Sequence, residues 1–287
     1  MQKAKENFSV LISVYGRENS SYLDEALGSL MDQTLLPSEI VLVKDGPLGA
    51  ELEEVIERYL RREEVAWKVV ALEKNHGLGK ALNRGLKHCS HEWVARMDSD
   101  DIAFPQRFQR QFDYLSRHPE LDLCGAWICE FHREPGECGD LRQVPEEHEE
   151  IVRFAAARNP VNHVTVLFRK SAVEKAGGYR HFPGFEDYAL WVRMILGGAR
   201  LGNLPEVLVA VRTGEEMIRR RRGWEYVRRE WRFQRWMGEV GFLGSAAVLR
   251  NLALRIPPRL LPGFLVQKVY SILRKQRKGC NESATKE

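Results

Sequence analysis

Runs of apolar residues with the length of a β-strand alternate with segments of helical periodicity over the first two thirds of the chain. Within these runs nearly every residue is hydrophobic, which is typical of strands buried on both faces. In the segments between them, apolar residues recur every three or four positions, as in helices with one buried face. The predicted strands are Phe8–Val14, 40–43, 65–72 and 93–97, and the predicted helices begin near Ser20 or Ser21, Leu52, Leu78 and Phe108.

The second part of the chain continues this alternation less regularly. Residues 121–128 and 164–168 have the apolar content of strands, and a further helix is predicted to begin at Glu186. From about residue 212 onward the chain is predicted to be mostly helical. Alternating strands and helices predict an α/β fold with a mainly parallel central sheet flanked by helices, and here with a helical C-terminal extension.

Acidic and polar loops follow three of the predicted strands. Asp45 comes directly after the second strand, residues 73–77 follow the third, and Asp98-Ser99-Asp100-Asp101 follows the fourth. Ligands of open α/β sheets bind beyond the carboxyl ends of the strands, so these loops are expected to share one edge. Three carboxylates within four residues suit Mg²⁺ or Mn²⁺ bound together with substrate phosphates. Taken alone, the same cluster is equally compatible with a solvated acidic turn.

The composition excludes several classes of protein. The chain has 44% hydrophobic and 29% charged residues, which is typical of a globular protein and not of a disordered one. Its five cysteines are an odd number without Cys-x-x-Cys spacing, so neither a disulfide framework nor a zinc site is predicted. No signal peptide and no membrane-spanning run are recognised, and the expected location is the cytoplasm.

The net charge of +4 conceals a strong asymmetry along the chain. Residues 1–211 carry 26 Lys and Arg against 33 Asp and Glu, whereas residues 212–278 carry 17 against 5. A basic segment on an acidic body indicates a polyanionic neighbour such as nucleic acid, anionic lipid or pyrophosphate. Three prolines are expected to break the helices near the end of this segment: Pro257, Pro258 and Pro262.

Aromatic side chains are interleaved with the arginines of residues 219–236. This mixture is compatible with stacking on nucleic acid bases, with a membrane interface, or with a solvated helix that packs on the rest of the protein. The apolar stretch 260–266 and the basic end 274–278 favour peripheral association with an anionic membrane surface.

Several motifs in order along residues 8–212 resemble glycosyltransferase family 2, whose members have the GT-A fold. Motifs at matching intervals are far more specific than any one of them alone. Where many members have paired Asp before Gly, this chain has Lys44-Asp45-Gly46-Pro47. The other motifs that carry the resemblance are Leu11–Glu18, Leu30–Thr34, 75–83, Arg96–Asp101, Pro105–Phe108 and Glu186–Tyr188.

This resemblance implies an inverting transferase that moves a sugar from a nucleotide donor, here favouring a UDP-sugar, to a hydroxyl of a saccharide acceptor. It implies a divalent cation, Mn²⁺ or Mg²⁺, and a lipid-linked acceptor in the synthesis of a surface polysaccharide. Residues 1–211 would form the catalytic domain, with a nucleotide-binding half (1–117) and an acceptor-binding half (118–211), followed by the basic extension 212–287. The pattern Gln-x-x-Arg-Trp of processive synthases does not follow Glu186, which favours transfer of a single sugar.

The resemblance also implies roles for the acids at the strand ends. Asp98 would contact the ribose and Asp100 would bind the metal ion, with Asp101 in support. Asp45 would accept a hydrogen bond from the uracil N3–H. The remaining candidates for nucleotide binding are Ser13 and Tyr15, which would line the base pocket, and Lys80, which would contact the phosphates.

On the acceptor side, Asp187 is the predicted general base for the attacking hydroxyl. Successive helical residues are about 100° apart, so Glu186 faces elsewhere and would orient a neighbouring group. Arg212 is a candidate contact of the diphosphate. His163 is a candidate metal ligand or acceptor contact, although a single His beside a strand is more often structural. An acidic pair at a helix start is also favoured by the helix dipole alone.

Three other classes of protein remain as alternatives. A nucleic-acid-binding or anionic-lipid-binding α/β protein without turnover is supported by the basic segment, but leaves the acids at the strand ends unexplained. A nucleotidyltransferase shares the sheet, although residues 14–17 are not a Gly-rich phosphate loop. A sugar-binding relative without activity is disfavoured because Asp100 and Asp187 are both present.

Overall fold

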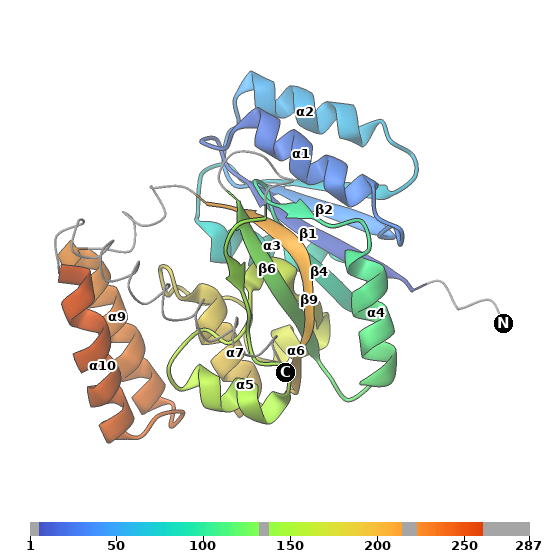
Figure 1. Cartoon of the computed structure of the whole chain (residues 1–287). Helices are drawn as coiled ribbons and strands as arrows, with labels where there is room; N and C mark the ends of the chain where they lie inside the picture. The colour runs from blue at the N-terminus through green and yellow to red at the C-terminus, as the bar shows by residue number, and fades with distance from the viewer. Residues whose placement is uncertain (1–5, 132–137, 214–222, 261–287) are drawn as a thin grey trace. The chain divides into compact units, whose positions relative to one another are not determined.

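The chain divides into two compact units, Met1–Thr213 and Gly214–Glu287. The computed structural model describes residues 6–131, 138–213 and 223–260 (Figure 1). The strands of the first unit are β1 (Phe8–Val14), β2 (Glu39–Lys44), β3 (Ala66–Ala71), β4 (Trp93–Asp98), β5 (Ile102–Ala103), β6 (Leu123–Phe131), β7 (Leu141–Arg142), β8 (Leu167–Arg169) and β9 (Leu201–Arg212). Its helices are α1 (Ser20–Met31), α2 (Ala50–Leu60), α3 (Leu78–His88), α4 (Arg107–Arg117), α5 (His148–Ala155), α6 (Lys170–Lys175) and α7 (Glu186–Leu196), with a 3-10 turn at His163–Thr165.

All strands of the first unit form one sheet in the order β3-β2-β1-β4-β8-β6-β9-β5, with β7 paired to β6. Neighbouring strands from β3 to β4 are parallel, and β6 is parallel to β9. The register places Ser13 opposite both Val43 and Asp98, so the carboxyl ends of β1, β2 and β4 lie at the same edge. The predicted α/β fold with a mainly parallel sheet is therefore confirmed.

The second half of the sheet is less regular than its sequence suggested. β8 pairs antiparallel with β4 and β6, and β5 pairs antiparallel with β9. The predicted strand 164–168 is partly wrong, because residues 163–165 form a 3-10 turn before β8 begins at Leu167. β9 was not predicted: Gly202 and Pro205 interrupt its apolar pattern, and its pairing with β6 contains register shifts.

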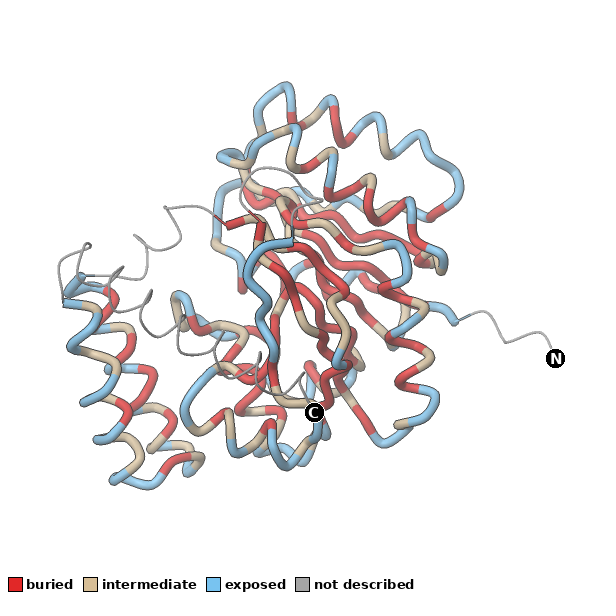
Figure 2. The backbone as a smooth tube through the Cα atoms, viewed as in Figure 1, coloured by how far each residue is buried: buried red, intermediate tan, exposed pale blue. Residues whose placement is uncertain are grey.

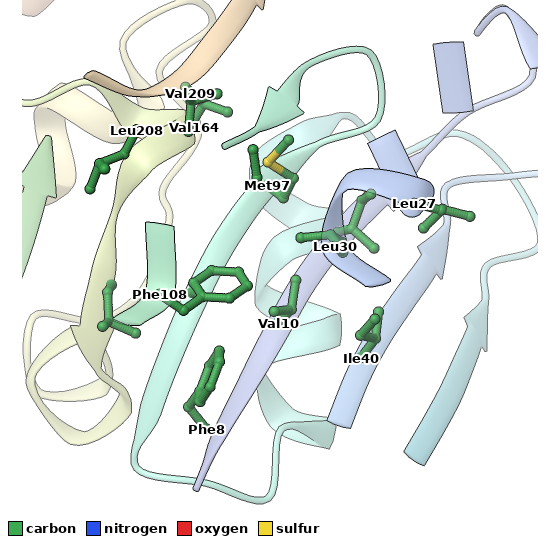
Figure 3. Close-up of a cluster of buried hydrophobic side chains, with 14 of the residues drawn as sticks. Phe8, Val10, Leu27, Leu30, Ile40, Met97, Phe108, Val164, Leu208 and Val209 are labelled. Carbon is green, nitrogen blue, oxygen red and sulfur yellow. The ribbon is translucent and has the colours of Figure 1, made fainter. Parts of the chain in front are cut away.

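Helices cover both faces of the sheet, which explains why its central strands, such as β1, are almost entirely apolar. Alternate residues of β1, such as Phe8 and Val10, pack in the cluster that holds side chains of α1, α2 and α4. Leu11, which points to the opposite face, belongs to the cluster with α3 and α7. The strands form a buried layer between more exposed helices (Figure 2). Figure 3 shows the first cluster, in which the ring centroids of Phe8 and Phe108 are 4.9 Å apart.

A buried ionic group lies at the start of β2. Glu39 accepts a hydrogen bond from Ser9 Oγ at 2.6 Å and lies 2.8 Å from Lys68 Nζ. Burial alone would raise the pKa of Glu39, but these partners and the backbone N–H of Ser90 lower it to about 2 from 4.5. A lowered pKa in the folded state contributes stability above the ordinary value, and this contribution is lost as the pH falls toward 2.

We therefore expect the free energy of unfolding to decrease by up to about 3 kcal/mol through Glu39 alone as the pH falls from about 5 to about 2. The variant Glu39→Gln should lack this component, so its stability should depend less steeply on pH in that window. Urea unfolding of both proteins at several pH values measures the difference. Equal pH dependence of the two proteins would show that Glu39 does not cause this loss of stability.

The second unit, considered by itself, contains a hairpin of α9 (Gly223–Glu239) and α10 (Ser245–Leu260). The fully buried Glu230 of α9 pairs with Arg255 of α10, and Arg259 lies 2.7 Å from its other carboxylate oxygen. The expectation that prolines break this segment is wrong for Pro257 and Pro258, which both lie inside α10. The ion pairs of Glu230 anchor this last turn of α10. Pro262 and the stretches 260–266 and 274–278 lie mostly or wholly outside the described residues.

The cysteine prediction requires a correction, because Cys129 and Cys138 form a disulfide with a Cα–Cα distance of 5.4 Å. Cys129 belongs to β6, and the chain returns beside that strand. The backbone N–H of Glu130 donates to Asp140 at 2.8 Å, and Gly139 donates to Glu130 at 2.8 Å. This return pairing, which the spacing of the cysteines does not reveal, brings the two thiols together.

Of the helices that the structure describes, none has the length and apolar content to cross a membrane.

Candidate functional site

The acidic loop after β4 brings together three carboxylates. Candidate ligand oxygens of Asp98, Asp100 and Asp101 all lie within 4.8 Å of one another. Asp98 is the last residue of β4 and lies in register with Ser13 of β1, as the strand-end argument predicted. The loop is therefore short, acidic and fixed at the carboxyl edge of the parallel strands, where a phosphorylated ligand with a hard cation would fit.

A buried arginine fixes the first of these acids. The side chain of Arg96 is only 2% exposed, and its two terminal nitrogens bond to the two carboxylate oxygens of Asp98. Burial lowers the pKa of Arg96, but Asp98, together with Tyr179 and Asp101, raises it above its ordinary value. Arg107, also buried, donates to the backbone oxygen of Arg96 at 2.7 Å. The orientation of Asp98 is thus fixed by a bidentate pair with Arg96, which the sequence did not reveal.

The other two acids are poorly compensated in the protein alone. Burial, followed by repulsion from Asp98, raises the pKa of Asp100 to about 6. Burial and the same neighbours raise the pKa of Asp101 well above its ordinary value, although its Oδ1 accepts a hydrogen bond from the Arg212 backbone at 2.8 Å. Three oxygen ligands that repel one another suit a divalent cation, which would relieve this repulsion. The residues present therefore fit Mg²⁺ or Mn²⁺.

Arg212, predicted to contact a diphosphate, lies at this loop and is extensively packed. Its Nε donates to the backbone oxygen of Asp100 at 3.2 Å, and its guanidinium pairs with Glu25 of α1. The guanidinium carbon lies 3.7 Å from the ring centroid of Tyr22 and 4.6 Å from that of Phe131. Arg212 therefore ties the acidic loop to α1 and β6, while contact with a diphosphate stays a prediction.

Asp45, after β2, holds the loop that leads into α3. Its Oδ1 accepts the backbone N–H of His76 at 2.7 Å, and its Oδ2 accepts that of Gly77 at 2.9 Å. Gly46 adopts a φ of 94°, and a Cβ there would lie 2.7 Å from the Asn75 nitrogen, so the loop packs tightly. Each carboxylate oxygen has a second lone pair, which leaves Asp45 able to accept a further hydrogen bond.

The remaining nucleotide candidates surround this edge. Ser13 and Tyr15 are half-buried at the end of β1, and their contact with a nucleotide base stays a prediction. Lys80 is exposed in the first turn of α3, where its contact with phosphates stays a prediction. Lys44 pairs with Glu53 of α2, so the lysine that replaces the family's usual Asp is engaged by a neighbouring helix.

Glu186 and Asp187 open α7 and diverge, as their helical geometry predicted. Asp187 Oδ2 accepts a hydrogen bond from Asn159 Nδ2 at 2.6 Å. Glu186 accepts the backbone N–H of Gly184 at 2.8 Å, and its pKa is raised by burial. A Cβ built on Gly79 of α3 would lie 3.3 Å from Glu186 Cγ. Gly79 thus lets the start of α7 pack closely against the start of α3, which joins the two halves of the site.

His163 is engaged away from the acidic cluster. Its Nε2 lies 2.9 Å from Tyr179 Oη, and burial, assisted by Arg96, lowers the pKa of His163 well below its ordinary value. Asn83 of α3 holds the same tyrosine, accepting from its backbone N–H at 2.8 Å and donating to its backbone oxygen at 2.6 Å. Among the described residues, the candidate metal ligands comprise the three aspartates and not His163.

Comparison with known proteins identifies a family and relatives of this chain. The model of glycosyl transferase family 2 matches residues 9–174. The amylovoran biosynthesis glycosyltransferase AmsE of Erwinia amylovora is 42% identical over 275 residues, covering 95% of this chain and 100% of AmsE. A UDP-Gal:alpha-D-GlcNAc-diphosphoundecaprenol beta-1,3-galactosyltransferase of Escherichia coli is 35% identical over 266 residues, covering 91% of this chain and 96% of the relative.

Solved structures share the fold. S. aureus TarS 1-349 in complex with UDP-GlcNAc gives a TM-score of 0.63 at 22% identity, covering 88% of this chain and 72% of that structure. The mannosyltransferase PcManGT from Pyrobaculum calidifontis, in complex with GDP-Man and Mn²⁺, gives 0.60 at 17% identity, covering 86% and 68%. These likenesses establish the GT-A fold.

The family model matches more than half of the chain, and both relatives align along nearly all of it. The carboxylates of Asp98, Asp100 and Asp101, predicted from the sequence, lie together at the carboxyl edge of the parallel strands. The protein therefore belongs to glycosyl transferase family 2 and is a glycosyltransferase.

Proposed function

We propose that this glycosyltransferase moves one sugar from a UDP-sugar to a hydroxyl of a lipid-linked saccharide, with inversion at the anomeric carbon. The observation that carries the proposal is the acidic cluster of Asp98, Asp100 and Asp101 at the carboxyl edge of the sheet. Inversion follows from a single displacement, in which the acceptor hydroxyl attacks opposite the departing diphosphate. The reaction therefore needs a base, an oriented donor and stabilisation of the leaving group.

At the donor end, Asp45 accepts a hydrogen bond from the nucleobase of the donor. Asp98, which is held by Arg96, contacts the ribose. Asp100 and Asp101 would hold a divalent cation, Mn²⁺ or Mg²⁺. When bound, that cation neutralises the charge that develops on the leaving diphosphate. A UDP donor is supported by the name of the galactosyltransferase relative and by the UDP-GlcNAc bound to TarS.

At the acceptor end, Asp187 removes the proton of the attacking hydroxyl. The amide of Asn159 occupies one carboxylate oxygen, Oδ2, and so turns the other toward the hydroxyl. Glu186, half-buried and close to Gly79 of α3, orients a neighbouring group of the same site. A base that is held in one orientation reduces the entropy lost on reaching the transition state.

The contact between Asn159 and Asp187 makes a specific prediction. In Asn159→Ala the base loses the donor that orients it, so kcat should fall by about tenfold. Steady-state kinetics at saturating substrate measures this effect. An unchanged kcat would show that this hydrogen bond does not serve catalysis.

The acceptor proposal draws on the relatives. One acts on GlcNAc linked to diphosphoundecaprenol, and another functions in amylovoran biosynthesis. We therefore assign a saccharide on a lipid diphosphate, in the synthesis of a bacterial surface polysaccharide, as the acceptor class. Purified protein is incubated with a synthetic GlcNAc-diphospho-lipid and with UDP-galactose, UDP-glucose, UDP-GlcNAc or GDP-mannose, and mass spectrometry detects the product. Addition of one sugar from a UDP donor is expected, and transfer from GDP-mannose alone would contradict the donor assignment.

The second unit has the chemistry of a peripheral membrane contact. Trp224, Arg228, Trp231 and Arg235 recur at intervals of three or four residues along α9, and the two tryptophans are 70% and 45% exposed. Tryptophan and arginine suit the headgroup region of a bilayer, and anionic lipid attracts the arginines. Such a contact would keep a cytoplasmic enzyme at the membrane that carries its acceptor.

We expect the protein to sediment with vesicles that contain phosphatidylglycerol and not with purely zwitterionic vesicles. The double variant Trp224→Ala and Trp231→Ala should bind the anionic vesicles more weakly, whereas the exposed Leu141→Ala should not differ from the wild type. Equal binding to both kinds of vesicle would contradict an anionic surface. Binding to single-stranded nucleic acid in preference to vesicles would support the alternative role of the arginines.

A further inference from the structure

A hollow of about 550 Å³ lies outside the acidic site, on α5 and the turns that flank it. Both charged and apolar side chains line it. The lining residues are Pro145, Glu150, Arg153, Phe154, Ala157 and Arg158. None of these was singled out by the sequence, since no motif marks them.

Two arginines dominate the charge of this hollow. Arg153 and Arg158 are both exposed, and in the described parts of the chain neither guanidinium has a hydrogen-bond or ion-pair partner. Nearby, Arg200 differs because it pairs with Glu149 at 3.1 Å. Free guanidinium groups present fork-shaped sets of donors, which match the oxygens of phosphates. The hollow is therefore suited to an anion larger than a single carboxylate.

The hollow is joined to the predicted base by direct contacts. Tyr188, the residue after Asp187, donates from its hydroxyl to the backbone oxygen of Ala155 at 2.6 Å, at the end of α5. Asn159, which follows the lining residue Arg158, is the donor to Asp187. Both links connect the start of α7 to the turn that forms the hollow.

A buried amide also fixes Pro145, one of the residues that line the hollow. Asn203 of β9 is fully buried, and its Nδ2 donates to the backbone oxygen of Pro145 at 2.5 Å and to that of Pro160 at 3.1 Å. Pro145 lines the hollow, and Pro160 follows Asn159 in the chain. One side chain therefore fixes both the wall of the hollow and the turn that orients the base.

We infer that this hollow binds the diphosphate of the acceptor, between Arg153 and Arg158, while the saccharide beyond it reaches Asp187. This inference rests on the proposed function. The acceptor diphosphate does not leave in the reaction, so it needs only binding, which arginines supply without a cation. The donor diphosphate does leave, at the acidic cluster that fits a divalent cation. Phe154 and Pro145 line the same hollow and provide apolar surface that suits the first carbons of the lipid.

The two sites therefore distinguish the two diphosphates of the reaction. Loss of the arginines should weaken binding of the acceptor and leave binding of the donor unchanged. Glu150 lines the same hollow with the opposite charge, so its removal should have the opposite effect. These signs identify an electrostatic effect, and a control at arginines outside the hollow separates a phosphate site from a general dependence on surface charge.

The test compares two acceptors that carry the same saccharide, one on a lipid diphosphate and one on a neutral alkyl chain. In the double variant Arg153→Gln and Arg158→Gln, KM for the diphosphate acceptor should rise by about tenfold or more. KM for the neutral acceptor and for the UDP-sugar should not change. Glu150→Gln should lower KM for the diphosphate acceptor, and Arg153→Lys should retain most of the wild-type affinity.

The double variant Arg61→Gln and Arg117→Gln serves as the matched control, because both arginines are exposed, one directly after α2 and one at the end of α4. If the Gln double variant does not fold, by circular dichroism and UDP binding, the single variants should each raise the same KM severalfold. An unchanged ratio between the two acceptors would overturn this inference but leave the proposed function standing. Failure of the wild type to transfer sugar to either acceptor would overturn both.

Discussion

The variant Asp187→Asn is expected to lose at least about a thousandfold in kcat, because an amide cannot accept the proton of the attacking hydroxyl. Asn159 orients one oxygen of this carboxylate in the folded protein, and the isosteric amide preserves the size of the side chain. Binding of UDP should therefore be unchanged. Transfer assays at saturating substrate, with calorimetric titration of UDP as a second readout, measure the two effects.

A matched control is Glu174→Gln, which removes a carboxylate from the exposed surface of α6. It should retain wild-type kcat. If Asp187→Asn retained full activity, another group would have to act as base, and the roles of both Asp187 and Asn159 would be contradicted. Loss of UDP binding together with activity would instead indicate that Asp187 supports the donor site.

The variant Asp100→Asn is expected to abolish activity through the metal. Burial and repulsion from Asp98 raise the pKa of Asp100 to about 6, so its charged form is disfavoured in the protein without a cation. Replacing one charged ligand by an amide should weaken Mn²⁺-dependent binding of UDP by about a hundredfold. Titration of UDP with and without Mn²⁺ measures this loss.

Asp32→Asn provides the control, because Asp32 is an exposed acid at the end of α1. It should bind UDP and Mn²⁺ as the wild type does. If Asp100→Asn kept metal-dependent binding and full activity, the assignment of the cation to the loop after β4 would be wrong.

The sequence predicts the parallel half of the fold well, because its signals are local. β1, β2 and β4 are continuous apolar runs, and the helices between them have clear periodicity. β9 escapes prediction because Gly202 and Pro205 interrupt a strand whose long pairing with β6 comes from tertiary structure. The prolines of α10 are misjudged for a similar reason, since contacts of Glu230 with Arg255 and Arg259 stabilise the helix around them.

The candidate site was also predicted only in part, and for the same reason. The aspartates after β4 are visible in the sequence because a strand end places them, and the structure brings them together. The partners that orient them are not visible: Asn159 reaches Asp187 across 28 positions, and the fully buried Arg107 supports Arg96 through a backbone contact. The disulfide between Cys129 and Cys138 is hidden in the same way, because it depends on the pairing of residues 139–140 with Glu130 of β6.

The central claim is a metal-dependent site for a UDP-sugar at the acidic edge of the sheet. Calorimetric titration of the purified protein with UDP and GDP, each with and without Mn²⁺, tests it most directly. The account predicts that UDP binds in the presence of Mn²⁺, much more weakly without it, and more tightly than GDP. Preference for GDP, or UDP binding that is indifferent to the metal, would contradict it.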